Sequence, residues 1–91
     1  MSAATIDVRL APLLRRLFPD AQPRLTLDAG TVAELVDRLD ARWPGMGDCI
    51  RDSRPAVRRH VSIFVEGRRA TLDTQLPPGA DVFILTAISG G

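Results

Sequence analysis

The sequence predicts an α+β fold, in which a mixed sheet of four to five strands carries one main helix on one of its faces. Apolar residues alternate with polar ones in several short segments, one longer segment has a helical period, and turn residues separate these segments. With 91 residues, 45% hydrophobic and 25% charged, the composition is that of a globular protein with one modest core. We therefore expect residues 1–91 to form a single domain that ends in a flexible tail, from about residue 87 to residue 91.

The first part of the chain supplies two predicted strands. Apolar residues at every second position predict a strand over residues 4–10 with one buried face. Residues 11–18 are compatible with either a helical turn or a tightly packed loop, which Pro19 ends. Alternation resumes over residues 24–28 and predicts a second, shorter strand.

The predicted main helix begins at Thr31. Thr31 and Glu34 form a capping-box pattern, in which the Thr31 hydroxyl accepts a hydrogen bond from the Glu34 N–H and the Glu34 carboxylate reaches back to the N–H of Thr31. Pro44 disfavours helical geometry at the residue before it, so we expect the helix to end near Trp43. The apolar stripe that follows a 3.6-residue period consists of Val32, Leu35, Val36, Leu39 and Trp43.

The second part of the chain predicts a long loop and three strands. Residues 45–59 contain glycine, proline and arginine without a clear period, and we expect a loop there. Residues 60–65 and 68–72 are predicted strands joined by a two-residue turn at Glu66 and Gly67. Residues 82–86 predict the final strand, so the expected order is two strands, a helix, and three strands.

The alternation of the last strands also predicts which side chains face away from the helix. If Val61, Ile63, Val65, Val82 and Ile84 face the helix, the residues between them must face outward. This reasoning predicts an apolar patch of Phe64, Phe83 and Leu85 on the open face of the sheet. Such a patch is often a partner site, although in a protein of this size flanking loops could instead cover it.

Composition disfavours several other classes of function. A formal net charge of +1 does not favour a nucleic acid or membrane partner, and no apolar run approaches the ~20 residues of a membrane span. One cysteine, Cys49, and one histidine, His60, support neither a zinc site nor a Cys-His nucleophile pair. We expect no metal and a cytoplasmic location. Four arginines of the 45–59 segment could bind phosphate: Arg51, Arg54, Arg58 and Arg59. Aspartates lie among them in the sequence, which favours a solvated loop over a phosphate site.

Three segments carry a resemblance to a known family. Residues 59–67, RHVSIFVEG, resemble a hairpin of the ubiquitin-like sulfur carriers of the MoaD and ThiS family, and GADV at 79–82 resembles their approach to the last strand. The ending ILTAISGG at 84–91 is similar to that of carriers of the CysO type, although Thr86 and Ala87 stand where such endings have one or two prolines. The resemblance spans nearly the whole chain and implies a β-grasp fold.

The resemblance also implies a function centred on Gly91. In this family an E1-like partner enzyme uses MgATP to adenylate the C-terminal carboxylate, and a sulfur donor converts it to a thiocarboxylate that serves a sulfur-accepting biosynthetic enzyme. The carrier itself would be a co-substrate and would bind no cofactor. Gly90, Ser89 and Ile88 would pass through the partner's channel, where glycine avoids collisions of a Cβ atom. Phe64, Phe83 and Leu85 would anchor the globular part.

The sequence leaves several functions open. The ending favours a cysteine-type pathway, but the same resemblance allows a molybdopterin synthase small subunit. A ubiquitin-like protein modifier would share the adenylation step, and a non-covalent binding module would keep the fold without the chemistry.

Overall fold

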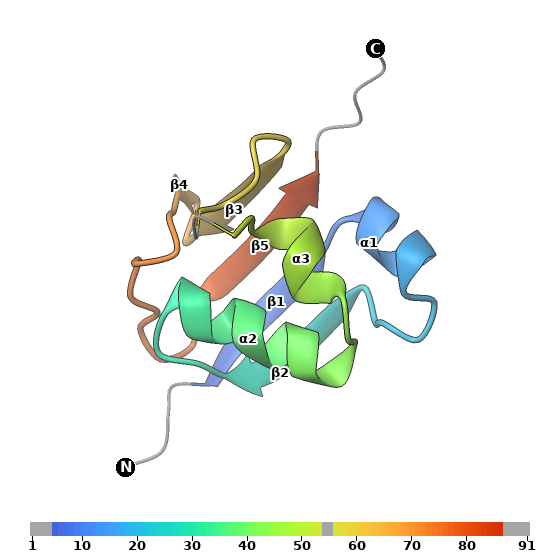
Figure 1. Ribbon diagram of the computed structural model, residues 1–91. Coiled ribbons are helices and arrows are strands. Elements are labelled where there is room, and N and C mark those ends of the chain that lie inside the picture. The colour runs from blue at the N-terminus through green and yellow to red at the C-terminus, as the bar shows by residue number, and fades with distance from the viewer. Residues whose placement is uncertain (1–4, 54–55, 87–91) are drawn as a thin grey trace.

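A computed structural model of the protein describes residues 5–53 and 56–86. Five strands form one sheet in the order β2-β1-β5-β3-β4, and α2 and α3 lie in front of it (Figure 1). The predicted β-grasp fold with a mixed sheet is confirmed. The elements along the chain are β1 (Thr5–Leu10), α1 (Pro12–Leu17), β2 (Arg24–Asp28), α2 (Val32–Arg42), α3 (Met46–Ile50), β3 (Val61–Val65), β4 (Arg68–Arg69) and β5 (Asp81–Thr86).

The strand that comes last in the sequence lies in the middle of the sheet. β5 pairs in parallel with β1, where Val8 lies opposite Val82, and antiparallel with β3, where Ile63 lies opposite Ile84. A parallel pair needs a crossover connection, and the chain between β1 and β5 passes through all the other elements. The last described residue, Thr86, therefore ends a strand that is held on both sides.

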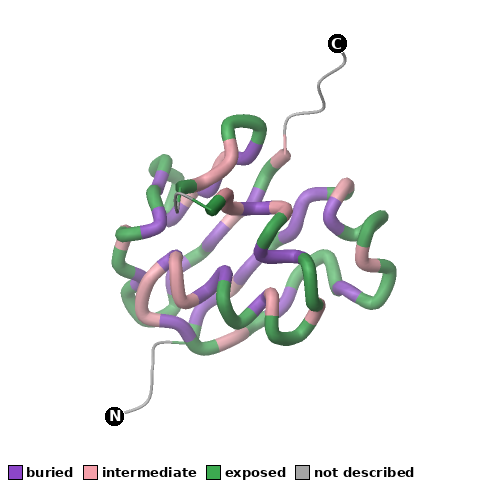
Figure 2. The backbone as a smooth tube through the Cα atoms, in the orientation of Figure 1, coloured by how far each residue is buried: buried purple, intermediate pink, exposed green. Residues whose placement is uncertain are grey.

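Side chains alternate between the core and the open face as the sequence predicts. Along β1, β3 and β5 the buried positions alternate with partly or fully exposed ones, which Figure 2 shows as alternating colours. On α2 the buried residues are Val32, Leu35, Val36 and Leu39, and Trp43 packs partly buried against the same core. The largest fully buried strand side chains beneath this helix are Ile6, Val8, Val61, Ile63 and Ile84.

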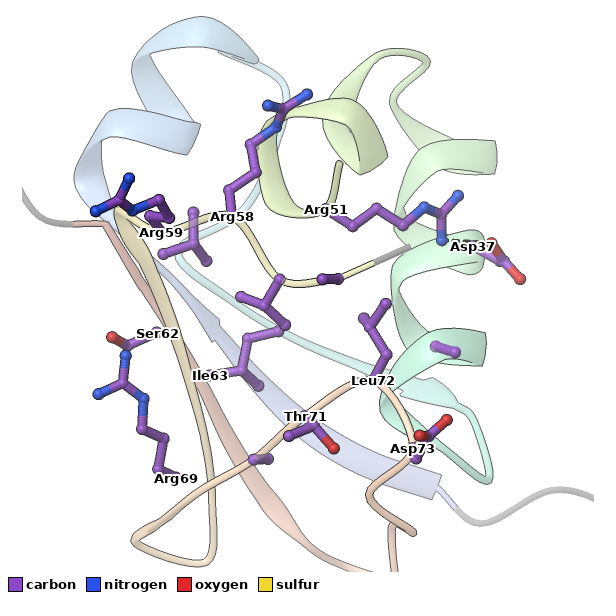
Figure 3. A pocket seen from close by; sticks show the side chains of 15 residues that line it. Asp37, Arg51, Arg58, Arg59, Ser62, Ile63, Arg69, Thr71, Leu72 and Asp73 are labelled. Carbon is purple, nitrogen blue, oxygen red and sulfur yellow. Dashed lines mark hydrogen bonds and ion pairs between the residues drawn. The ribbon is translucent and has the colours of Figure 1, made fainter. Parts of the chain in front are cut away.

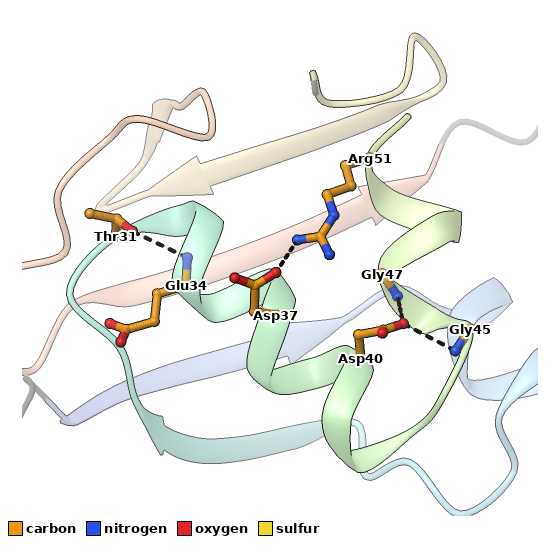
Figure 4. Close-up of polar contacts among 7 residues, drawn as sticks. All are labelled: Thr31, Glu34, Asp37, Asp40, Gly45, Gly47 and Arg51. Atoms are coloured by element: carbon orange, nitrogen blue, oxygen red, sulfur yellow. Dashed lines mark hydrogen bonds and ion pairs between the residues drawn. The ribbon is translucent and has the colours of Figure 1, made fainter. Parts of the chain in front are cut away.

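The start of α2 is capped nearly as predicted. The Glu34 N–H donates to Thr31 Oγ1 at 3.1 Å (Figure 4). The Glu34 carboxylate, however, accepts from the Gly30 N–H at 2.6 Å and not from Thr31. The predicted partner was wrong by one residue. The carbonyl of Gly30 also accepts a hydrogen bond, from the Leu76 N–H at 2.9 Å, so both backbone groups of this residue are engaged.

The segment expected to be a long loop contains a short helix, α3. Asp40, on α2, accepts hydrogen bonds at Oδ1 from the Gly45 N–H at 3.1 Å and the Gly47 N–H at 2.9 Å (Figure 4). Gly45 has a φ of 100°, a left-handed conformation that glycine adopts without a Cβ penalty. Met46 and Ile50 are fully buried, so this corner of the chain belongs to the core.

The strand predicted over residues 68–72 is much shorter. β4 pairs only Arg68 and Arg69 with β3, after a turn in which Glu66 and Gly67 have φ values of 52° and 81°. That pair of positive φ values is typical of the predicted two-residue hairpin turn. Beyond β4 the chain leaves the sheet, because the carbonyl of Leu72 accepts from the Ala33 N–H at 2.9 Å. A backbone carbonyl that would have extended the strand is therefore hydrogen-bonded to the start of α2 instead.

Residues 11–18, for which helix and loop were both possible, contain a helix. Pro12 occupies its first turn, where the missing N–H costs nothing, and Leu14 is buried. The Phe18 N–H donates to the Leu14 carbonyl at 2.9 Å and closes the last turn. None of the helices in the described part of the chain is long and apolar enough to cross a membrane.

Candidate functional site

The open face of the sheet carries one continuous row of side chains that crosses all five strands. The register places Arg24 opposite Arg9, Arg9 opposite Phe83, Phe83 opposite Phe64, and Phe64 opposite Arg69. Residues in register on neighbouring strands share a face of the sheet, so these side chains lie side by side. We call this set the Arg-Phe row: Arg24, Arg9, Phe83, Phe64 and Arg69.

The two aromatic residues form the centre of the row. Phe64 and Phe83 are both partly buried, whereas their neighbours along the strands, among them Ile63 and Ile84, are fully buried against the helices. The Arg9 guanidinium lies over the ring of Phe83, with its carbon 4.8 Å from the ring centroid. A cation-π contact of this kind holds the arginine against the sheet while its outer edge stays available to solvent.

Leu85 extends the apolar surface toward the end of β5. Its side chain is 45% exposed, and in the described part of the chain only Leu17 is a more exposed large apolar residue. Leu85 lies opposite Ser62 in the register, on the same face as Phe83. The predicted positions of Phe64, Phe83 and Leu85 on the open face are confirmed, while their role in binding a partner stays a prediction.

The residues predicted to carry the chemistry lie outside the described part of the chain. Ile88, Ser89, Gly90 and Gly91 fall in the range 87–91, and the structure places only the residue that leads toward them. Thr86 lies opposite Val61 at the end of the central strand.

A pocket of about 660 Å³, for which the sequence gives no signal, lies on the other side of β3. It lies between α2, the segment before β3 and the segment after β4, and Figure 3 shows Ile63 and Leu72 pointing into it. Ser62 and Arg69 are also among the lining residues, although in this view their side chains lie on the other side of β3. Its apolar lining includes Ala33, Val57, Val61, Ile63, Ala70 and Leu72.

Arginines of the 45–59 segment border this pocket, and two of them are fixed by contacts within the domain. Arg51 Nη1 donates to Asp37 Oδ1 at 2.6 Å, and Arg58 Nε donates to the Asp48 carbonyl at 2.5 Å. These bonds tie the segment to α2 and α3, and both bonds are exposed, so the preference for a solvated segment over a phosphate site is not contradicted. Arg59 is exposed, and the structure describes nothing of Arg54.

Two candidate residues remain, Cys49 and His60. Cys49 is a free, partly buried cysteine that packs against the core, and His60 is exposed at the entry to β3. Within residues 5–53 and 56–86, no three His, Cys, Asp or Glu side chains lie close enough together to hold a metal ion. The described surface thus presents an open face with an apolar centre and a pocket.

Sequence reasoning did not find the arginines of the row. The alternation of β1 places Arg9 on the open face, but its position beside Phe83 depends on the parallel pairing of β1 with β5. The sequence predicts a strand at Arg69 but not the side of the sheet to which its side chain points. Its place beside Phe64 follows from the hairpin register. A two-residue turn fixes such a register, so this part of the row could have been inferred from the sequence.

Solved structures of small proteins share this fold. SAMP1 from Haloferax volcanii is 18% identical, with 97% of this chain and 100% of that chain covered and a TM-score of 0.81. A chain of the BexX/CysO complex from Amycolatopsis orientalis is 20% identical, with 94% and 99% covered and a TM-score of 0.82. At these identities the likeness shows the fold alone.

Among curated proteins, a glutamine-hydrolysing GMP synthase from Burkholderia mallei is 37% identical over 76 residues, which is 78% of this chain. The chain spans only 14% of that protein's length, so the match carries nothing about the activity of the whole synthase. The model of the ThiS family, by contrast, matches residues 13–91, which extend from α1 to the final glycine. The β-grasp architecture agrees with that match, and the chain belongs to the ThiS family, whose fold is that of the ubiquitin-like sulfur carriers.

Proposed function

We propose that this protein is a sulfur carrier whose reactive group is the carboxylate of Gly91. An E1-like enzyme would bind the open face of the sheet and transfer AMP from MgATP to the carboxylate, with release of pyrophosphate. The sulfur donor would then attack the acyl carbon and displace AMP. Sulfide gives the thiocarboxylate directly, whereas a persulfide first gives an acyl disulfide, whose S–S bond a thiol then cleaves with formation of a new disulfide. The product is a thiocarboxylate, which a sulfur-accepting enzyme would use in the biosynthesis of a small metabolite or cofactor, a cysteine-type pathway being favoured.

The position of β5 is the observation that carries this proposal. The central strand runs through Phe83 and Leu85 on the open face and then leads toward Gly91, five positions beyond Thr86. Five extended residues span at most about 18 Å, which sets the largest distance between the end of the sheet and the acyl carbon. A partner that covers the open face next to Leu85 can therefore hold a nucleotide within reach of the carboxylate.

The described residues fit a passive role in this chemistry. The carrier needs no acid, base or metal of its own, because the partner supplies the nucleotide and the adenylating site. What the carrier must supply is binding energy, since immobilising each residue of its tail costs about 1 to 2 kcal/mol. The apolar centre of the open face offers that energy through Phe64, Phe83 and Leu85, all of them at least partly accessible.

The extension of the chain by one alanine after Gly91 tests the proposal. The added residue displaces the reactive carboxylate by about 3.5 Å, and reacting atoms must approach to about 3 to 3.5 Å. We expect ATP-pyrophosphate exchange with the organism's E1-like enzyme to be lost, while the melting curve of the extended protein stays that of the wild type. Normal exchange by the extended protein would remove Gly91 from the mechanism.

A protein modifier is the second candidate, because the fold is shared with SAMP1, a small archaeal modifier protein. It would use the same adenylation step and would fail equally after the alanine extension. Intact-mass analysis distinguishes the two after incubation with the activating enzyme, MgATP and a sulfur source. Replacement of one oxygen by sulfur on the carrier supports the first function, and adducts on target proteins support the second.

A further inference from the structure

We infer that Arg9 and Arg69 select a protein partner whose docking surface is apolar at its centre and carries a carboxylate on either side. This inference rests on the proposed function, because it describes the surface that the activating enzyme presents to the open face. It adds to that function the chemistry by which the partner is recognised. The apolar centre meets Phe64 and Phe83, and the two carboxylates meet the arginines that flank them.

The strand register fixes the spacing of the two arginines. Arg9 lies directly beside Phe83, and Arg69 lies directly beside Phe64, so the four side chains occupy four neighbouring strands. Neighbouring strands are about 4.8 Å apart, so Arg9 and Arg69 leave the sheet about 14 Å apart. Two carboxylates on the partner, one near each of these side chains, would pair with both arginines at once.

The two arginines are also the members of the Arg-Phe row whose charges are free to pair with a partner. Arg24 already pairs with Asp7, with 3.6 Å between Nη2 and Oδ2. Arg9 and Arg69 are both exposed, and neither forms an ion pair with a carboxylate among residues 5–53 and 56–86. The contact with Phe83 restrains Arg9 in advance, which reduces the entropy lost when a partner binds it.

A row of arginine and phenylalanine on an open sheet could in principle stack the bases of a single-stranded nucleic acid. The rest of the face argues against that ligand. Asp81 lies on the same face as Phe83, and its charge, unlike that of Asp7, is not balanced by an ion pair among the described residues, so it would repel a phosphate backbone. The formal net charge of +1 gives no general attraction for a polyanion. The alternation of both charges around an apolar centre favours a folded protein partner.

Arg68 and Arg69 make a matched pair for testing this inference. They are consecutive, both are exposed, and both lie in β4, but Arg68 lies opposite the buried Val65 and therefore on the other face from Arg69. Arg68→Glu and Arg69→Glu change the net charge equally and at nearly the same place. Arg9→Gln tests the other arginine independently, and melting curves of each variant verify that the fold is kept.

The measurement is the Kd of each variant for the purified E1-like enzyme, by titration calorimetry at about 50 mM and about 300 mM NaCl. At low salt we expect Arg69→Glu to weaken binding about tenfold and Arg9→Gln to weaken it severalfold, with both differences smaller at high salt. Arg68→Glu should bind like the wild type. Equal effects of Arg68→Glu and Arg69→Glu, or no effect of either, would overturn the inference, and so would a wild type that does not bind.

Two further arms separate this inference from its alternatives. ATP-pyrophosphate exchange by the wild type tests the proposed function, so binding without exchange would refute the chemistry and leave the docking surface intact. Fluorescence anisotropy with a labelled single-stranded RNA of about 12 nucleotides tests the other ligand class. Binding of that RNA that is lost in Arg69→Glu and kept in Arg68→Glu would assign the row to nucleic acid and overturn the inference.

Discussion

Two neighbouring residues of β5 provide the most direct test of how the sheet divides its faces. Ile84 is fully buried, whereas Leu85 is 45% exposed on the open face. We predict that Ile84→Ala strongly destabilises the domain, while Leu85→Ala has a small effect. The comparison is well matched because both changes remove a branched apolar side chain from the same strand.

The expected magnitudes follow from burial. Truncation of a fully buried isoleucine costs about 2 to 5 kcal/mol, and a loss of about 3 kcal/mol lowers the Tm of a domain of this size by about 12 to 24 °C. Leu85 has about half of its surface covered, so its truncation removes about 1 kcal/mol and lowers the Tm by about 4 to 8 °C. Thermal unfolding monitored by circular dichroism measures both shifts.

The functional arm of this prediction uses Leu85→Arg. The substitution places a charge on the open face, where it stays solvated in the free protein but is desolvated without a partner in the complex. We expect a melting curve close to that of the wild type and a KM for the carrier in ATP-pyrophosphate exchange that rises about tenfold, equivalent to about 1.4 kcal/mol. The reasoning would be refuted if Leu85→Ala destabilised as much as Ile84→Ala, or if Leu85→Arg exchanged normally.

Two further predictions concern the polar contacts that hold α2. Asp40→Ala removes the acceptor for the N–H groups of Gly45 and Gly47. We expect the free energy of unfolding in urea titrations to fall by about 2 kcal/mol. An unchanged value would show that the link between α2 and α3 does not depend on that carboxylate. Thr31→Ala removes the cap of the Glu34 N–H and should cost about 1 kcal/mol in the same assay, whereas Thr31→Ser should keep the wild-type value; equal losses in both variants would contradict a capping role.

The elements that the sequence predicts well are those whose pattern is set by one buried face. In β3 and β5 strict alternation identifies both the strand and the outward side of Phe64 and Phe83, because a strand side chain has only two directions available. In α2 the stripe beginning at Val32 is long enough to define a helix without knowledge of its partners.

The features that the sequence pattern did not predict depend on contacts with residues outside their own segments. α3 is stabilised by Asp40, which lies five and seven positions before the N–H groups that it accepts from. β4 ends before residue 72 because the Leu72 carbonyl accepts a hydrogen bond from the start of α2. Alternation along β5 places Phe83 on the open face, but it does not show which residue lies beside it. Arg9 lies beside Phe83 only because β1 pairs with β5, and these strands come from opposite ends of the chain.

The central place of β5 has a mechanical consequence. A partner that pulls on the chain beyond Thr86 applies its force along the strand that is hydrogen-bonded to β1 on one side and to β3 on the other. Such a load acts in shear on both ladders together, whereas a strand at the edge of the sheet would peel away one bond at a time. We therefore expect the domain to keep its fold when a force is applied to the chain beyond Thr86. The pairing of β5 on both sides should likewise slow an unfolding protease that pulls on the chain from this side.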